Sequence, residues 1–233
     1  MIKQSGAGSK RIKAQIKGPS GGTYNYDIPT TGSYQTIPLQ MGSGTYQVSV
    51  LKQVSGQQYS YLINKKISVS LSSPSINFLY PSQFVNYNSG SQALRKGYGL
   101  CMNAKSDLEK VRSVYNWIVT NISYDYNKAA SVSSGYIPNV DKTLSSKKGI
   151  CFDYAALMAA MLRPQGIPTK MIFGYSGGVY HAWNQVYISG VGWIAVGIKS
   201  NGGWKLLDTT FAASGTDAGY LSNSGNYSGQ KVY

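Results

Sequence analysis

The apolar residues of this chain recur with a period of two over the first third and with a helical period later, and this change constrains its fold most. Before residue 72, apolar residues alternate with polar ones, as at Ile12, Ala14 and Ile16, and glycine-rich turns separate the runs. This alternation is typical of antiparallel strands with one buried face. The predicted strands lie near residues 12–16, 46–50, 59–63 and 67–71. We therefore expect residues 1–73 to form a small Ig-like β-sandwich, an accessory module without a catalytic group.

A second domain is predicted to begin after segment 72–75, which contains a proline. Ser106 and Glu109 have the spacing of a capping box, and apolar residues follow them at helical spacing. Another helix is predicted over residues 151–162. Four strands are then predicted, near residues 170–175, 180–188, 193–196 and 204–208. We therefore expect residues 74–211 to form an α+β domain, with helices first and an antiparallel sheet after them.

Three parts of this second half are predicted to lack regular structure. Segment 123–148 is polar and is expected to be a loop, and segment 212–233 is rich in Gly, Ser and Asn and is expected to be a partly disordered tail. Cys101 lies in an irregular stretch, where its thiol has no obvious activator. We expect Cys101 to be a partly buried structural residue.

Lysine and arginine outnumber the acidic residues, 22 to 8, so the formal net charge is +14. The basic residues form no run of about five or more and no nucleic-acid motif accompanies them, so we expect no specific nucleic-acid binding. Attraction to an anionic polymer, such as a bacterial cell wall, stays open. No run reaches the ~18 apolar residues of a membrane span. Few charged residues beside many Gly, Ser, Asn and Tyr favour a secreted or cell-surface bacterial protein, its export signal absent from this sequence, over a cytoplasmic one.

His181 is the only histidine in the sequence, so an imidazole base would have to be this residue. It lies in a predicted strand in which alternate residues share one face, so Trp183 and Gln185 are expected to point the same way. We expect these two side chains to line a substrate cleft beside the imidazole.

Two cysteines are candidates for a nucleophile. Cys151 comes at the first turn of a predicted helix, where backbone N–H groups and the helix dipole favour a thiolate. A neighbouring imidazolium would stabilise that thiolate further and give the ion pair of cysteine acyl-transfer enzymes. A disulfide between Cys101 and Cys151 is the alternative, and it would abolish the activity.

The acidic residue that orients the imidazole must be one of only eight in the sequence. Asp208 ends the last predicted strand. If this strand pairs with that of His181, the carboxylate can accept a hydrogen bond from the imidazole and fix its tautomer. Asp153 follows Cys151 by two residues and is expected to point elsewhere, as a structural charge at the helix N-terminus.

Several segments of the chain resemble the transglutaminase-like superfamily. They are 149–157 (GICFDYAAL), 166–168 (GIP), 181–184 (HAWN), 204–210 (WKLLDTT) and, upstream, 121–125 (NISYD). The resemblance covers roughly residues 77–210. It implies a papain-like fold and a catalytic triad of Cys151, His181 and Asp208.

The resemblance also implies an oxyanion site and a two-step reaction. The oxyanion donors would be the backbone N–H of Cys151 and an upstream side chain, for which Tyr124 and Tyr126 are the candidates. A thiolate would attack an amide carbonyl of a protein or peptide to give a thioester. Water would then hydrolyse the thioester in a peptidase or amidase, whereas an amine would accept the acyl group in a transamidase. Because the few acids form no cluster, we expect no metal and no cofactor.

Two other functions stay open at this stage. One is a catalytically silent surface or cell-wall binding module that keeps the fold. The other is an adhesin that binds polyanions through its net positive charge and is therefore sensitive to salt.

Overall fold

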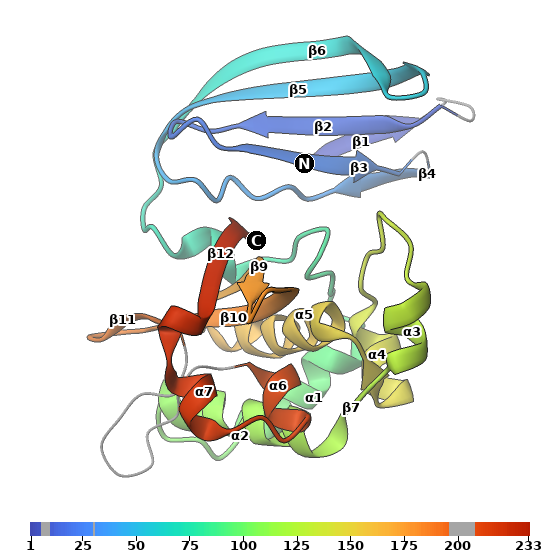
Figure 1. The fold of residues 1–233 in the computed structure, drawn as a ribbon. Helices are drawn as coiled ribbons and strands as arrows, with labels where there is room; N and C mark the ends of the chain where they lie inside the picture. The colour runs from blue at the N-terminus through green and yellow to red at the C-terminus, as the bar shows by residue number, and fades with distance from the viewer. Residues whose placement is uncertain (6–9, 30, 196–207) are drawn as a thin grey trace. The chain divides into compact units, whose positions relative to one another are not determined.

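The computed structural model describes residues 1–5, 10–29, 31–195 and 208–233 of the chain (Figure 1). The chain divides into two compact units, residues 1–77 and 78–233. The division falls four residues beyond the predicted domain boundary, within the short 3-10 helix η1 (Ile76–Leu79). Each unit is described by itself below.

The first unit is all-β. Its main sheet is antiparallel, in the order β3-β2-β5-β6, and a separate two-stranded pair is made by β1 and β4. The strands are β1 (Ile2–Ser5), β2 (Ile12–Lys17), β3 (Thr23–Ile28), β4 (Thr31–Gln35), β5 (Gly44–Ser55) and β6 (Gln58–Val69). Alternate residues such as Ile12, Ala14 and Ile16 are buried, as the period of two predicts.

Two features of this unit differ from the sequence prediction. The two strands predicted near 59–63 and 67–71 are one long strand, β6, which pairs with β5 along its length. The polar residues between them, such as Asn64 and Lys65, are exposed and do not interrupt the ladder. Strand β3, which was not predicted, buries Tyr24, Tyr26 and Ile28.

The second unit is built around helix α5 (Cys151–Leu162). Figure 1 shows this helix between the sheet and the helices α1 (Gln92–Cys101) and α2 (Asp107–Asn121). From Asp153 to Leu162 every residue of α5 is buried, because protein surrounds the helix on all sides. The short 3-10 helix η2 (Arg163–Gln165) follows it, and Gly166 ends this turn in the left-handed conformation.

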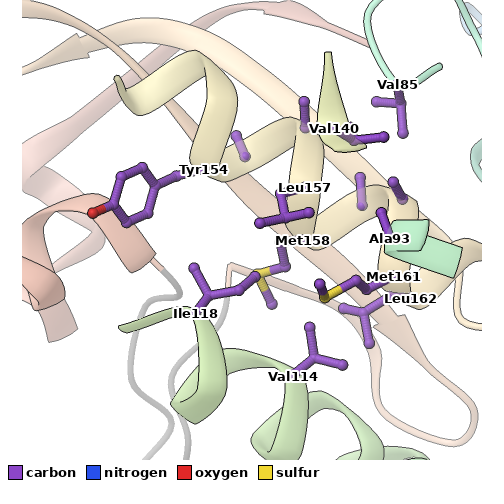
Figure 2. Packing of buried hydrophobic residues seen from close by; sticks show 14 of the residues in the cluster. Val85, Ala93, Val114, Ile118, Val140, Tyr154, Leu157, Met158, Met161 and Leu162 are labelled. Carbon is purple, nitrogen blue, oxygen red and sulfur yellow. The ribbon is translucent and has the colours of Figure 1, made fainter. Parts of the chain in front are cut away.

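Interlocking side chains hold α5 against its neighbours. In Figure 2, Met158 and Met161 point from α5 toward Ile118 and Val114 of α2, and all four are fully buried. On α1, Gly97 lies so close to α5 that a Cβ there would meet the backbone oxygen of Met161 at 2.7 Å. A glycine at this position therefore lets the two helices approach closely.

The sheet of the second unit has the order β11-β10-β9-β12 and is antiparallel throughout. Its strands are β9 (Thr169–Ser176), β10 (Val179–Ile188), β11 (Gly192–Ala195) and β12 (Tyr227–Val232). The first three match the predicted strands. The strand predicted over 204–208 falls outside the described residues except for Asp208, which is the N-cap of helix α6 (Thr209–Ala213).

The tail over 212–233, predicted to be partly disordered, is part of the folded unit. It contains α7 (Ala218–Ser222), the 3-10 turn η3 (Ser224–Asn226) and β12, which pairs with β9. Tyr233 and Met171 exchange two backbone hydrogen bonds of 2.7 Å. A Gly- and Ser-rich segment can make backbone hydrogen bonds of this kind, so the prediction of disorder from composition was wrong for this tail.

Segment 123–148, predicted to be a loop, is also ordered. It contains β7 (Ser123–Tyr124), α3 (Tyr126–Ser131), α4 (Val140–Ser146) and β8 (Lys148–Gly149). Side chains cap both helices: Asp125 accepts a hydrogen bond from the Lys128 N–H and Asn139 from the Lys142 N–H, each at 2.9 Å. These helices are too short to show a helical period, and helix α1 was likewise predicted to be irregular.

No helix among the described residues is long and apolar enough to cross a membrane.

Candidate active site

Cys151 is the first residue of α5 and is half-buried. The chain reaches it in an extended conformation at Ile150, so the helix begins abruptly at the cysteine. The Ile150 N–H donates to the carboxylate of Asp153 at 2.9 Å, which holds this start in place. The thiol therefore lies at the positive end of a long buried helix.

A two-residue parallel bridge fixes the backbone just before the cysteine. Strand β7 pairs with β8, so that Tyr124 lies opposite Gly149. The Asp125 N–H also donates to the Gly149 oxygen at 2.9 Å. This bridge brings the Tyr124 side chain next to Cys151, although the two residues are far apart in sequence.

His181 lies on β10, opposite Gly174 of β9, and is only 3% exposed. Its Nε2 is 2.5 Å from Oδ2 of Asp208, and the ring of Phe211 stacks on the imidazole at 4.2 Å and 6°. The imidazole ring thus packs against Phe211 on one face and is hydrogen-bonded to Asp208 through Nε2. Cys151 is the other hydrogen-bonding partner that contributes to the pKa of His181.

Asp208 is fully buried and well supplied with donors. Its Oδ1 accepts from the backbone N–H groups of Thr210 and Phe211 at 3.1 and 3.0 Å, because Asp208 caps helix α6. Its Oδ2 receives the imidazole and also the hydroxyl of Tyr227, at 3.3 Å. These partners replace the water that a buried carboxylate loses.

The surroundings keep His181 protonated at neutral pH. Burial alone favours the neutral imidazole, but the hydrogen bonds and charges of Asp208 and Cys151 outweigh burial and raise the pKa of His181 to about 9. An imidazolium beside the thiol is the partner that stabilises a thiolate. Sequence reasoning nominated Cys151, His181 and Asp208, and the structure brings them together at one point.

Two tyrosines, Tyr124 and Tyr180, interact with Cys151. Burial, and then the neighbouring charge of Cys151, raise the pKa of Tyr124. Burial, Tyr175 and Cys151 raise the pKa of Tyr180 on β10. Tyr126 packs edge-on against Tyr124 at 5.0 Å and is 73% exposed. Of the two tyrosines proposed as oxyanion donors, Tyr124 lies opposite Gly149 in the bridge just before Cys151.

The two predicted cleft residues lie elsewhere. Trp183 is 4% exposed, stacked on His181 at 6.2 Å and edge-on to Tyr227 at 5.2 Å, so it supports the imidazole from behind and is not open to substrate. Gln185 is half-buried opposite Lys170, four residues along β10 from His181 and hence about 13 Å away. Trp183 does lie on the same face of β10 as His181, as the alternation predicts, but this face is buried near His181.

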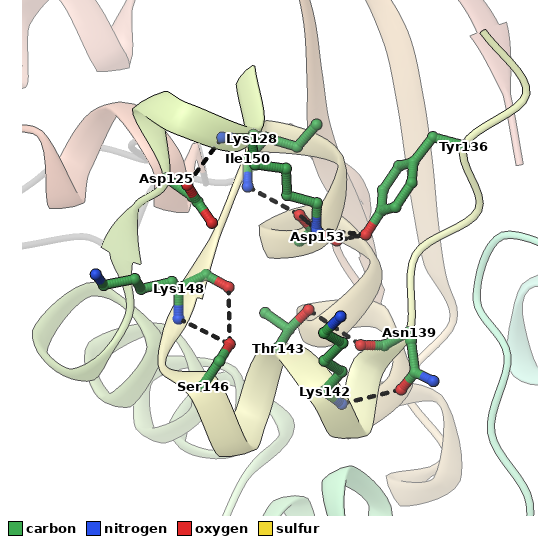
Figure 3. A network of polar contacts seen from close by, with 10 residues as sticks. All are labelled: Asp125, Lys128, Tyr136, Asn139, Lys142, Thr143, Ser146, Lys148, Ile150 and Asp153. Atoms are coloured by element: carbon green, nitrogen blue, oxygen red, sulfur yellow. Dashed lines mark hydrogen bonds and ion pairs between the residues drawn. The ribbon is translucent and has the colours of Figure 1, made fainter. Parts of the chain in front are cut away.

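Asp153 forms a network that the sequence did not predict beyond its position (Figure 3). It is fully buried and accepts hydrogen bonds from the Lys128 ammonium and the Tyr136 hydroxyl, each at 2.6 Å, besides the one from Ile150. The ammonium of Lys128 also contacts the Tyr136 hydroxyl. Segment 123–148 thus supplies the counter-charge beneath the start of α5, and no local pattern around Lys128 signals this role.

Cys101 ends α1 and is buried, and both cysteines are free, so the disulfide alternative does not occur. Burial raises the pKa of the Cys101 thiol, and Lys110 offsets this in part. Among the described residues, no three His, Cys, Asp or Glu side chains gather as metal ligands.

Comparison with known proteins gives a family for this unit. The sequence model of the Transglutaminase-like superfamily matches residues 97–198. The mouse Kyphoscoliosis peptidase is 35% identical over 130 residues, which are 51% of this chain and 18% of that protein. The human Kyphoscoliosis peptidase is 30% identical over 130 residues, with the same coverage of 51% and 18%. The chain thus spans about a fifth of the length of these curated relatives.

Among solved structures, a cysteine-protease candidate from Cytophaga hutchinsonii is 22% identical, with a TM-score of 0.49 over 70% of this chain and 48% of that one. The segments that carry Cys151 and His181 lie inside the stretch that matches the family model. Residues 97–198 of the second unit therefore match the transglutaminase-like superfamily.

Proposed function

We propose that the second unit is a cysteine acyl-transfer enzyme that opens amide bonds of proteins or peptides. The observation that carries this proposal is the position of His181, which contacts Asp208 on one side and Cys151 on the other at the start of α5. A thiol between a helix N-terminus and an imidazolium is the arrangement that supplies a nucleophilic thiolate near neutral pH.

In the first step, the Cys151 thiolate attacks the carbonyl carbon of an amide and forms a C–S bond, and the carbonyl electrons move to oxygen. The backbone N–H of Cys151, at the first turn of α5, is left without a helical acceptor and can donate to this oxyanion. The Tyr124 hydroxyl is the second candidate donor. When the oxyanion collapses, the C–N bond breaks and His181 gives its proton to the leaving amine.

In the second step, neutral His181 takes a proton from the acceptor, whose oxygen or nitrogen attacks the thioester and releases the thiolate. Water as the acceptor gives hydrolysis, and an amine gives transamidation. The name peptidase of the two curated relatives favours hydrolysis. Tyr180, which is exposed and interacts with Cys151, offers a flat apolar surface to a peptide chain.

Alkylation with iodoacetamide at neutral pH tests the proposal without a known substrate. Cys151 is expected to react much faster than Cys101, which serves as a control in the same molecule. His181→Ala removes the imidazolium, so it is expected to slow the reaction by about tenfold or more. Tryptophan fluorescence and the unfolding midpoint check that this variant is folded.

Equal and slow labelling of both cysteines would contradict the proposal and favour a catalytically silent binding module. The acceptor is identified separately, by mass spectrometry of peptides that contain Gln and Lys. Addition of water with cleavage indicates a peptidase, and loss of ammonia with joining of two peptides indicates a transamidase. Conversion of Gln to Glu without cleavage indicates an amidase. Wild-type protein is compared with Cys151→Ala in each case.

A further inference from the structure

A pocket of about 350 Å³ lies in segment 123–148, on the side of α5 that holds Asp153. Figure 3 shows its surroundings. The lining residues are Asp125, Lys128, Ser131, Tyr136, Asn139, Lys142, Thr143, Ser146 and Lys148. We call this site the lysine pocket. Its volume is at the small end of ligand sites, so it suits one side chain of a larger ligand.

We propose that the lysine pocket is a subsite that binds an acidic side chain of the peptide substrate. This proposal rests on the proposed function, because it assigns a substrate feature to the same active site.

The charges around the pocket leave one positive charge in surplus. Lys128 is compensated by the buried carboxylate of Asp153, to which it donates at 2.6 Å. The negative charge of Asp125 offsets the charge of one further lysine, and its Oδ1 already accepts a hydrogen bond from the Lys128 N–H. Among the described residues, Lys142 and Lys148 form no ion pair within 4.0 Å. A single surplus charge matches a carboxylate better than it matches a phosphate dianion.

The Asn139 side chain supplies a neutral donor, because its Oδ1 accepts from the Lys142 N–H and its amide nitrogen is left for a ligand. The Ser131 and Ser146 hydroxyls line the same pocket but already donate to the backbone oxygens of Asn127 and Lys148. Asp141, the acidic residue of α4, accepts a hydrogen bond from the Ala93 N–H at 2.8 Å and so faces α1 and not the pocket. An acidic side chain could therefore be bound by charge and by hydrogen bonds together.

The pocket lies within reach of the reacting bond. Lys148 precedes Cys151 by three residues, so their Cα atoms are at most about 11 Å apart. The Asp125 N–H donates to the oxygen of Gly149, two residues before Cys151, at 2.9 Å. Since an extended peptide advances about 3.3 Å per residue, a side chain in the pocket belongs to a residue within about three or four positions of the scissile bond.

Binding to a catalytically inactive protein tests this assignment. The probes are acetyl-Ala-Glu-Ala-amide and the matched acetyl-Ala-Gln-Ala-amide, titrated by NMR into Cys151→Ala. We expect the Glu peptide to bind about tenfold more tightly, and we expect the combined Lys142→Gln and Lys148→Gln changes to remove this preference. Lys65→Gln with Lys66→Gln, a change of equal charge on exposed residues of β6, is expected to keep it.

Three results would overturn the proposal: no preference for Glu, an equal loss of preference in the Lys65 and Lys66 control, or tighter binding of inorganic phosphate than of the Glu peptide. The first two indicate that the pocket is not a subsite, and the third indicates a phosphate site. Because binding is measured without the thiol, its failure is separate from a failure of the alkylation test on the wild-type protein.

Discussion

Replacing Asp208 with asparagine should change how the stability of the second unit depends on pH. The pKa of His181 is raised from 6.5 to about 9, and each pKa unit corresponds to about 1.4 kcal/mol. Because this pKa is raised, the His181 imidazole of the folded unit keeps its proton at pH values at which the unfolded chain has already released it. This contribution, about 3 kcal/mol, is therefore complete below pH 6.5 and is lost as the pH rises through 9.

In Asp208→Asn the carboxylate is absent, while the amide oxygen can still accept from the Thr210 and Phe211 N–H groups. Without the hydrogen bond and charge of Asp208, the pKa of His181 falls from its wild-type value, so the variant loses less stability than wild type as the pH rises from 6 to 10. The variant should be up to about 3 kcal/mol less stable than wild type at pH 6, and this difference should shrink as the pH rises to 10.

Urea unfolding followed by tryptophan fluorescence measures this difference. All four tryptophans lie beyond residue 77, so the signal reports the second unit. Groups that interact with neither Asp208 nor His181 titrate alike in both proteins and cancel in the difference. A difference between the two proteins that is constant from pH 6 to pH 10 would refute the charge coupling described above.

Two further substitutions test the packing and the polar network near α5. Gly97→Ala should destabilise the second unit by about 1–3 kcal/mol because its methyl group meets the Met161 backbone, whereas Gly99→Ala, on the same helix with open space around it, should be neutral or slightly stabilising in the same urea titration. Asp153→Ala leaves the Lys128 ammonium without its buried counter-charge and removes a hydrogen bond at the start of α5, so it should cost about 3 kcal/mol or more. An Asp153→Ala protein as stable as wild type would show that the ion pair contributes nothing net.

The parts of the fold that the sequence predicts well are those with a clear hydrophobic period. Helices α2 and α5 and strands β9 and β10 each carry enough apolar residues to mark their faces. The positions of Cys151 and His181 followed from these elements. Their nearness to Asp208 followed from the family resemblance, and their catalytic role stays a prediction until the thiol is tested.

The parts that were missed depend on contacts distant in sequence. Strand β12 exists because it pairs with β9, and the short helices α3 and α4 are stabilised by caps and by packing. Nothing local to Lys128 or Tyr136 shows that they meet Asp153. Trp183 was assigned to a cleft because periodicity gives the face of a side chain but not what covers that face.

The parallel bridge between β7 and β8 has an evolutionary consequence. It pairs the two ends of the segment that contains α3 and α4, next to the nucleophile. With both ends fastened, residues 126–147 could lengthen, shorten or be exchanged among homologues while the Cys151 backbone stays where it is. Substrate preference could then change through this segment alone, while Cys151, His181 and Asp208 stay the same.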